Sequence, residues 1–214
     1  MFSKYLGTLL VAAAALIATS QANGDILFES GTLGVTGIPR ESATATNVNQ
    51  FVYPGVRFYL SQPAITSQIG GHFVSESSGT FFGAIVVLED ANDFPNSSDL
   101  STLDVLGTTS LTFPVPSAEV FGNLEIQLDP GWYALVFGSG LFGTSGDGAA
   151  LRNNPDIGDP SYIGYGPNLN WFNLEIFQTH FVDHRFVVTG NFVPEPSTLT
   201  LLLLIALWPR RHAR

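Results

Sequence analysis

Several residue types that support common protein functions are absent or scarce in this chain of 214 residues. It has no cysteine, which excludes disulfide bonds, thiolate metal sites and cysteine nucleophiles. Charged residues make up only 12% of the sequence, about half the ~25% of an average soluble domain. Basic residues number 8 against 18 acidic residues, and the net charge of −10 argues against nucleic acid as a partner.

The residues that are present indicate a folded, turn-rich chain. Hydrophobic residues make up 45% of the sequence, which argues against disorder. Glycine occurs 22 times, proline 13 times and phenylalanine 17 times, so a long-helix or coiled-coil protein is also disfavoured.

The N-terminus has the pattern of a secretory signal peptide. Lys4 is followed by an apolar stretch over residues 9–18, and then by the small residues Ser20 and Ala22 around Gln21. Ten apolar residues span about 15 Å as a helix, against a hydrocarbon core of about 30 Å, so a transmembrane helix is disfavoured. We expect secretory signal peptidase to cleave after Ala22.

The C-terminus has three parts in a fixed order. The segment from Val193 through Pro194, Glu195 and Pro196 to Ser197 is proline-rich, and proline favours an extended backbone before it. A short apolar run over residues 199–208 follows, which predicts a short hydrophobic helix. A basic tail contains Arg210, Arg211 and Arg214, which the positive-inside rule keeps on the cytoplasmic side as a basic anchor.

This tripartite tail resembles the PEP-CTERM sorting signal of bacterial surface proteins. The resemblance covers residues 194–214. It implies export, recognition by a membrane-embedded exosortase, removal of the tail, and release or attachment at the cell surface. Proteins with this signal are associated with bacteria that make exopolysaccharide and biofilm matrix. The apolar run departs from the pattern by being short, which favours transient insertion in the membrane over permanent anchoring.

We therefore divide the chain into a signal peptide (1–22), a single domain (23–193) and a sorting signal (194–214). The domain has four arginines, no lysine and 17 acidic residues, which give it a net charge near −13. Such a surface repels anionic polymers unless divalent cations bridge the two.

Alternating apolar residues predict strands throughout the domain. A near-continuous apolar run over 81–88 predicts a buried strand, with Gly83 as a candidate bulge. Residues 120–128, a turn at Asp129-Pro-Gly131 and residues 132–137 predict a hairpin, with Trp132 in the core. Residues 98–106 fit either a short helix or an edge strand. Further strands are predicted over 51–53 and 56–60, separated by a break at 54–55, and over 65–69, 72–74, 171–177 and 185–189.

No strand–helix–strand units are visible, so a parallel sheet is disfavoured. The sequence predicts an all-β fold with a single β-sandwich or jelly-roll domain.

Motifs for catalysis are weak. Residues 138–143 satisfy G-x-G-x-x-G after a predicted strand, but more turn residues follow instead of a helix, so dinucleotide binding is disfavoured. Ser139 and Ser145 lie in glycine-rich turns outside the G-x-S-x-G pattern of a nucleophile elbow, although His72, His180 or His184 could supply a base.

Two loops concentrate oxygen ligands for calcium, which binds six to eight hard oxygens. One loop contains Asp90, Asn92 and Asp93, and the other contains Asp156 and Asp159. Neither loop has EF-hand spacing, so solvated acidic turns are the favoured interpretation and no cofactor is expected.

Exposed aromatic rings could stack on sugars. Tyr162 and Tyr165 lie in a Gly-containing segment that is typical of a loop, and we single them out as candidate sugar contacts. The alternative is ordinary core and turn packing.

The sequence thus predicts an exported surface or extracellular-matrix protein with a structural or adhesive, non-catalytic role. Its expected partners are signal peptidase, an exosortase and, less directly, exopolysaccharide. The first alternative is a secreted carbohydrate-binding module, and the second is a secreted hydrolase.

Overall fold

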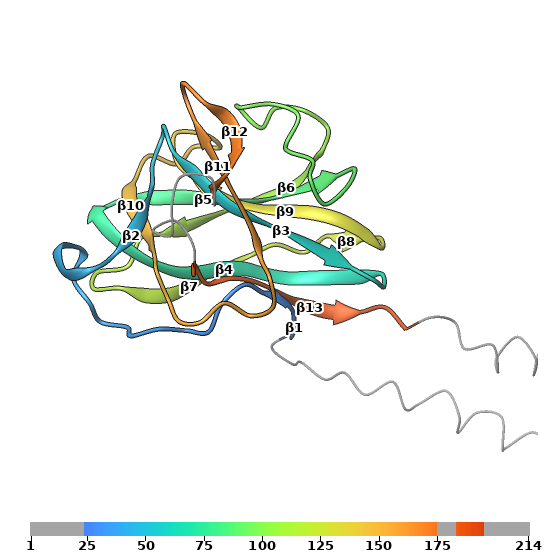
Figure 1. The fold of residues 1–214 in the computed structure, drawn as a ribbon, viewed down its shortest axis with the longest axis horizontal. Helices are drawn as coiled ribbons and strands as arrows, with labels where there is room; N and C mark the ends of the chain where they lie inside the picture. Colours follow the sequence, from blue (N-terminus) through green and yellow to red (C-terminus); the bar gives the residue numbers. More distant parts are fainter. Residues whose placement is uncertain (1–23, 175–182, 195–214) are drawn as a thin grey trace, which may run out of the picture.

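The structure, a computed structural model, describes residues 24–174 and 183–194. In these ranges the chain is all-β, as the sequence predicts, with thirteen strands and one short 3₁₀ turn, η2 (Arg40–Ser42). The strands form two antiparallel sheets that lie one above the other in Figure 1. This arrangement is consistent with a β-sandwich.

The seven-stranded sheet has the order β1-β13-β4-β10-β2, and β7 and β8 pair with β4 as well. Its centre is β4, a strand of 14 residues. The strands are β1 (Asp25–Glu29), β2 (Ala45–Val48), β4 (Ala64–Ser77), β7 (Ala118–Asn123), β8 (Gln127–Leu128), β10 (Asp147–Leu151) and β13 (Phe186–Phe192).

The six-stranded sheet has the order β12-β11-β3-β9-β5-β6. The strands are β3 (Tyr53–Leu60), β5 (Thr80–Leu88), β6 (Val105–Thr112), β9 (Gly131–Gly138), β11 (Ser161–Gly166) and β12 (Asn170–Asn173).

The main core lies between the two sheets. Along β9 every second residue, Tyr133, Leu135 and Phe137, points into this core, as the period of two in a strand requires. Phe73 of β4 meets it from the other sheet, with ring centroids 4.6 Å from Phe81 and 4.9 Å from Phe137. Aromatic packing across the layers therefore joins the two sheets.

A second core covers the opposite face of the six-stranded sheet. Phe82, Ala84 and Val86 of β5 point into it, together with Ala134 and Val136 of β9. Residues of the loop 89–104, among them the buried Leu100, pack against these strands from outside. Both faces of β5 are thus buried, which explains why the apolar run over 81–88 shows no alternation.

The predicted hairpin over 120–137 is wrong. Strands β7 and β8 pair with β4 of one sheet, whereas β9 pairs with β3 and β5 of the other. The turn at 129–131 therefore crosses between the layers. Leu124 and Leu128, which gave the alternating pattern, still point into the core between the sheets.

The predicted strand residues 65–69 and 72–74 are confirmed and both belong to β4. Two local expectations are wrong. Strand β3 runs without a break through Pro54 and Gly55. The register shift in β5 lies between Ile85 and Val86, away from Gly83. A Cβ at Gly83 would lie 2.8 Å from the Ile69 side chain, so close packing requires this glycine.

The segment 98–106 forms turns followed by the start of β6, and the helical alternative is wrong. Leu100 is buried whereas Leu103 is 98% exposed, so the two leucines do not share the apolar face that a helix would give them.

The two ends of the described domain lie together. Strand β1 pairs with β13, and Figure 1 shows both at the same side of the molecule. The Val193 amide donates to the Pro63 carbonyl at 2.8 Å, and the next residue, Pro194, is exposed. The predicted signal peptide, apolar run and basic tail lie outside the described residues. Among the residues that are described, no helix has the length and apolar character to cross a bilayer.

The side chain of His184 is fully buried. Its Nδ1 lies 3.0 Å from the Leu151 carbonyl, which can only accept, so Nδ1 carries the proton and Nε2 accepts from the Thr46 hydroxyl at 2.8 Å. Burial lowers the pKa of His184 from 6.5 to about 4.

This pKa shift predicts acid sensitivity. Between pH 6.5 and about 4 the unfolded chain binds a proton at His184 that the folded chain excludes, so the free energy of unfolding falls as the pH falls. The total loss should be about 3 kcal/mol. Urea unfolding across this range measures it. His184→Gln should be less stable at neutral pH but should show a flatter pH dependence, and an unchanged dependence would contradict the assignment.

Candidate functional site

Tyr162 is buried, and the prediction that it contacts sugar from a loop is wrong. It lies in strand β11, points into the core between the sheets and is only 1% exposed. Its hydroxyl oxygen lies 2.6 Å from Asp156 Oδ1, to which it donates, and 2.8 Å from the His184 carbonyl oxygen. Burial, and then the contact with Asp156, raises the pKa of Tyr162 above its usual range. Tyr162 is therefore part of the packing of the core between the sheets.

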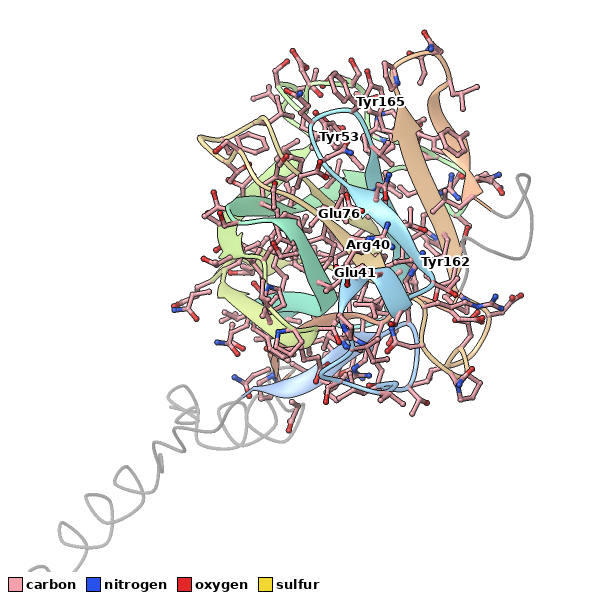
Figure 2. All side chains as sticks on the ribbon, turned by 90° about the vertical axis from the view of Figure 1, so that its left-hand side faces the viewer. Arg40, Glu41, Tyr53, Glu76, Tyr162 and Tyr165 are labelled. Atoms are coloured by element: carbon pink, nitrogen blue, oxygen red, sulfur yellow. The ribbon has the colours of Figure 1, made fainter. Side chains whose placement is uncertain are left out.

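Tyr165 also lies in strand β11, on the outer face of the six-stranded sheet. Its ring stacks on Tyr53, with centroids 5.1 Å apart, and lies 5.5 Å from Trp171. Figure 2 shows Tyr53 and Tyr165 close together and Tyr162 well separated from them. Tyr165 is half-buried, and neighbouring rings already contact it, which leaves little of it for a sugar.

The carboxylates of the first calcium candidate loop close turns within the loop. Asp90 Oδ1 accepts from the Asn92 amide at 2.7 Å. Asp93 accepts from the backbone amides of Glu89 and Phe94, each at 2.8 Å. The contact between Asp90 and Asn92 is that of an Asx turn, and all three local hydrogen bonds give the acidic residues a structural use.

In the second calcium candidate loop, Asp156 accepts the Tyr162 hydroxyl and Asp159 is exposed. Burial raises the pKa of the Asp156 carboxyl. Within the described ranges no group of three or more histidine, aspartate or glutamate side chains is placed to hold a metal ion. Solvated acidic turns without calcium stay the prediction for the two loops, and calcium binding stays the alternative.

The described candidate residues for hydrolysis do not form a catalytic arrangement at the surface. His72 and His184 are both buried and neither lines one of the surface hollows described below. Ser139 is buried and its hydroxyl donates to the Gly146 carbonyl at 2.6 Å. His180 lies outside the described residues.

The sorting motif is described only at its start. Val193 makes a backbone hydrogen bond and Pro194 is exposed, as given above. Glu195, Pro196 and Ser197 lie outside the described residues, as do Arg210, Arg211 and Arg214.

Sequence reasoning missed a partly exposed aromatic pair. Tyr59 of β3 and Trp132 of β9 are directly paired in the sheet, with ring centroids 5.2 Å apart, and Tyr59 is 54% exposed. A period of two would have identified Trp132, because it is out of phase with Leu135 and Phe137 and must point to the other face. Trp132 packs against the second core and is half-buried, so its expected core packing lies on the opposite face of the sheet from Leu135 and Phe137.

Trp132 of this pair lines a hollow of about 460 Å³ at the end of the six-stranded sheet. The apolar wall of this hollow contains Val87 and Leu106, each of which is 39% exposed. Three exposed polar side chains also line it: Glu89, Gln127 and Asp129. The arrangement offers an apolar surface beside hydrogen-bonding groups, as ligand sites do.

A larger hollow of about 760 Å³ lies beside η2 and β4. Its basic residue, Arg40, donates to Glu76 at 2.9 Å and to Asn47 at 2.9 Å. Figure 2 shows Arg40 next to Glu76. Because Glu76 neutralises this arginine, the hollow has no free positive charge to attract an anion.

A third hollow, which we call the polar pocket, has a volume of about 310 Å³. It lies between the loop that joins β2 to β3 and the glycine-rich loop that joins β9 to β10. Its lining residues are Asn49, Gln50, Phe51, Ser139, Gly140, Ser145, Gly146 and Asp147.

A buried arginine holds the loop 89–104 on the six-stranded sheet. Arg57 is 3% exposed and donates to the carbonyls of Asp93 at 2.7 Å and Asn92 at 3.1 Å. It also donates to Ser161 and Asn173, and its guanidinium lies 4.3 Å from the centre of the Phe94 ring. One side chain thus joins β3, β11, β12 and the covering loop.

Comparison with models of known protein families finds no match to the chain, and comparison with curated proteins finds none either.

Loss of Arg57 should loosen the covering loop. Arg57→Ala removes a charged donor and leaves buried carbonyls unpaired, so we expect a destabilisation of about 3 kcal/mol in urea unfolding. Chymotryptic cleavage within 89–104 should also become faster. The matched control is Arg152→Ala, whose salt bridge to Asp183 is one-third exposed and should contribute at most about 1 kcal/mol. Equal effects of the two variants would contradict the role of Arg57.

Proposed function

We propose that this chain is an exported bacterial protein of the cell surface or extracellular matrix, sorted by its C-terminal Pro-Glu-Pro motif. The observation that carries the proposal is the end of the last described strand. Strand β13 stops at Phe192, Val193 still makes a backbone hydrogen bond to the domain, and Pro194 is exposed. The Pro-Glu-Pro sequence therefore follows this strand after a single residue.

This boundary supports processing of a folded protein. An enzyme that grips an extended peptide needs the peptide free of the sheet, and proline cannot donate to a strand ladder. We infer that the domain 23–193 is a β-sandwich between a cleaved signal peptide and a short hydrophobic helix. The helix anchors the protein in the membrane transiently, and an exosortase then acts at the motif.

A structural or adhesive, non-catalytic role fits the domain best. His72 and His184 are buried and held by hydrogen bonds, which removes them as bases for a surface reaction. The domain also has no lysine to serve as a nucleophile. We therefore favour binding to matrix components over hydrolysis.

Fractionation with intact-mass measurement tests the sorting proposal. We expect a surface or released product that lacks the signal peptide and the residues after Pro196. Glu195→Ala together with Pro194→Ala should leave the tail uncleaved, because the motif is lost while the fold is untouched. Glu41→Ala, an exposed acidic residue of the domain, is the control. An intact tail on cytosolic wild-type protein would contradict the proposal.

Carbohydrate binding is the second candidate function. The aromatic pair Tyr59–Trp132 favours it, because half-exposed rings beside the polar residues of the neighbouring hollow offer both a stacking face and hydrogen bonds. The ligand would be an exopolysaccharide met outside the cell.

Affinity electrophoresis in gels that contain neutral or acidic polysaccharides tests this second function. Tyr59→Ala should weaken binding about fivefold, since an aromatic contact contributes about 1 kcal/mol. The matched control is Phe121→Ala, which removes a 38% exposed ring from β7 of the other sheet and should bind as the wild type does. If the two variants migrate equally, the Tyr59–Trp132 pair does not bind sugar.

A further inference from the structure

The polar pocket is built from two loops that hydrogen bonds hold in place. The Ser139 amide donates to the Asn49 carbonyl at 3.2 Å, which joins the loops. Asn49 Oδ1 accepts from the amides of Phe51 at 2.9 Å and Val52 at 3.0 Å, and so closes the first loop. The Ser139 hydroxyl closes the second loop through Gly146. The pocket is therefore preorganised.

Glycines let the two loops approach each other. Gly140 has φ +82°, and a Cβ there would lie 2.7 Å from the Gln50 Cβ. A Cβ at Gly138 would meet the Tyr53 ring at less than van der Waals distance. Close packing thus requires these two glycines of the G-x-G-x-x-G pattern, and Gly140 forms part of the pocket wall whereas Gly138 packs against the ring of Tyr53.

The wall contains a carboxylate oxygen in need of a donor. Asp147 lines the pocket, and its Oδ1 is buried without a hydrogen-bond partner among the residues that the structure describes. A buried, unpaired acceptor of this kind costs free energy. The carboxyl torsion of aspartate is broad and two-fold, so a small rotation turns this oxygen toward a hydroxyl that enters the pocket.

The other lining residues fit a neutral ligand that carries many hydroxyl groups. Phe51 is 56% exposed and offers an apolar face, while Asn49 and Gln50 carry amides that can donate and accept. No basic residue lines the pocket, and Asp147 repels anions. We propose that the polar pocket binds one ring of a neutral sugar chain, with Asp147 accepting ring hydroxyls and Phe51 contacting the C–H face.

A metal ion fits the same residues less well. Calcium takes six to eight oxygens and favours several carboxylates, whereas Asp147 is the only acidic residue of the lining. The exposed Phe51 ring has no use in a calcium site. The proposal rests on the carbohydrate-binding function given above, and it adds a second contact point that is separate from the Tyr59–Trp132 pair.

Isothermal titration of the folded domain with neutral hexasaccharides of glucose, mannose and xylose, and with an alginate hexasaccharide, tests the proposal. Wild-type protein should bind at least one neutral probe and should not bind alginate. Asp147→Asn and Phe51→Ala should each weaken that binding tenfold or more. Asp99→Asn, a fully exposed aspartate outside the hollows, is the matched control and should leave the affinity unchanged. Phe51→Ala decides the outcome if Asp147→Asn does not fold, because the Phe51 side chain is exposed.

The outcomes separate the pocket from the wider function. Binding that Tyr59→Ala abolishes but Asp147→Asn and Phe51→Ala leave intact would overturn the pocket and keep the carbohydrate function. No binding of any neutral probe by the wild type would overturn both. Calcium binding that depends on Asp147, with no effect of sugar, would overturn the pocket proposal in favour of a cation site.

Discussion

The structure depends on covering the six-stranded sheet on both faces. An antiparallel sheet usually leaves one face to water, but here Phe82, Ala84 and Val86 of β5 lie in a second core, to which the loop 89–104 contributes Leu100 and Phe94. The loop lacks regular structure and cannot satisfy its backbone by a ladder, so its carbonyls need donors from elsewhere. Arg57 supplies them from the sheet itself, and the Trp171 indole adds a further bond to the Ser97 carbonyl at 3.1 Å.

The sequence predicts the all-β class because strand periodicity and turn residues are local signals. It also identifies the run over 81–88 as buried. The layer that each strand joins is a long-range property, which is why residues 120–137 were assigned to one hairpin although they belong to both sheets. Tertiary contacts also decide between the helix and the edge strand for residues 98–106. They bury Leu100, and the local sequence pattern does not show this burial.

The sequence predicts the solvent exposure of side chains at the candidate sites less well than any other property of these sites. Tyr162 and Tyr165 sit among glycines, which indicates a loop, yet those glycines belong to a strand: a Cβ at Gly164 would lie 2.8 Å from the Leu174 side chain. Trp132 could have been placed from its phase in the strand. The polar pocket could not have been predicted, because its two loops lie about ninety residues apart and meet only through the fold.

The charges of the domain limit which polymers it can bind. Its four arginines are all engaged within the fold: Arg40 with Glu76, Arg152 with Asp183, Arg185 with Glu29 and Glu119, and Arg57 beneath the covering loop. With no lysine, the domain has no other positive side chain apart from protonated histidine. An anionic polymer would therefore meet uncompensated carboxylates and be repelled unless a divalent cation bridged the two. A neutral chain meets no such barrier, and short-range stacking and hydrogen bonding decide whether it binds.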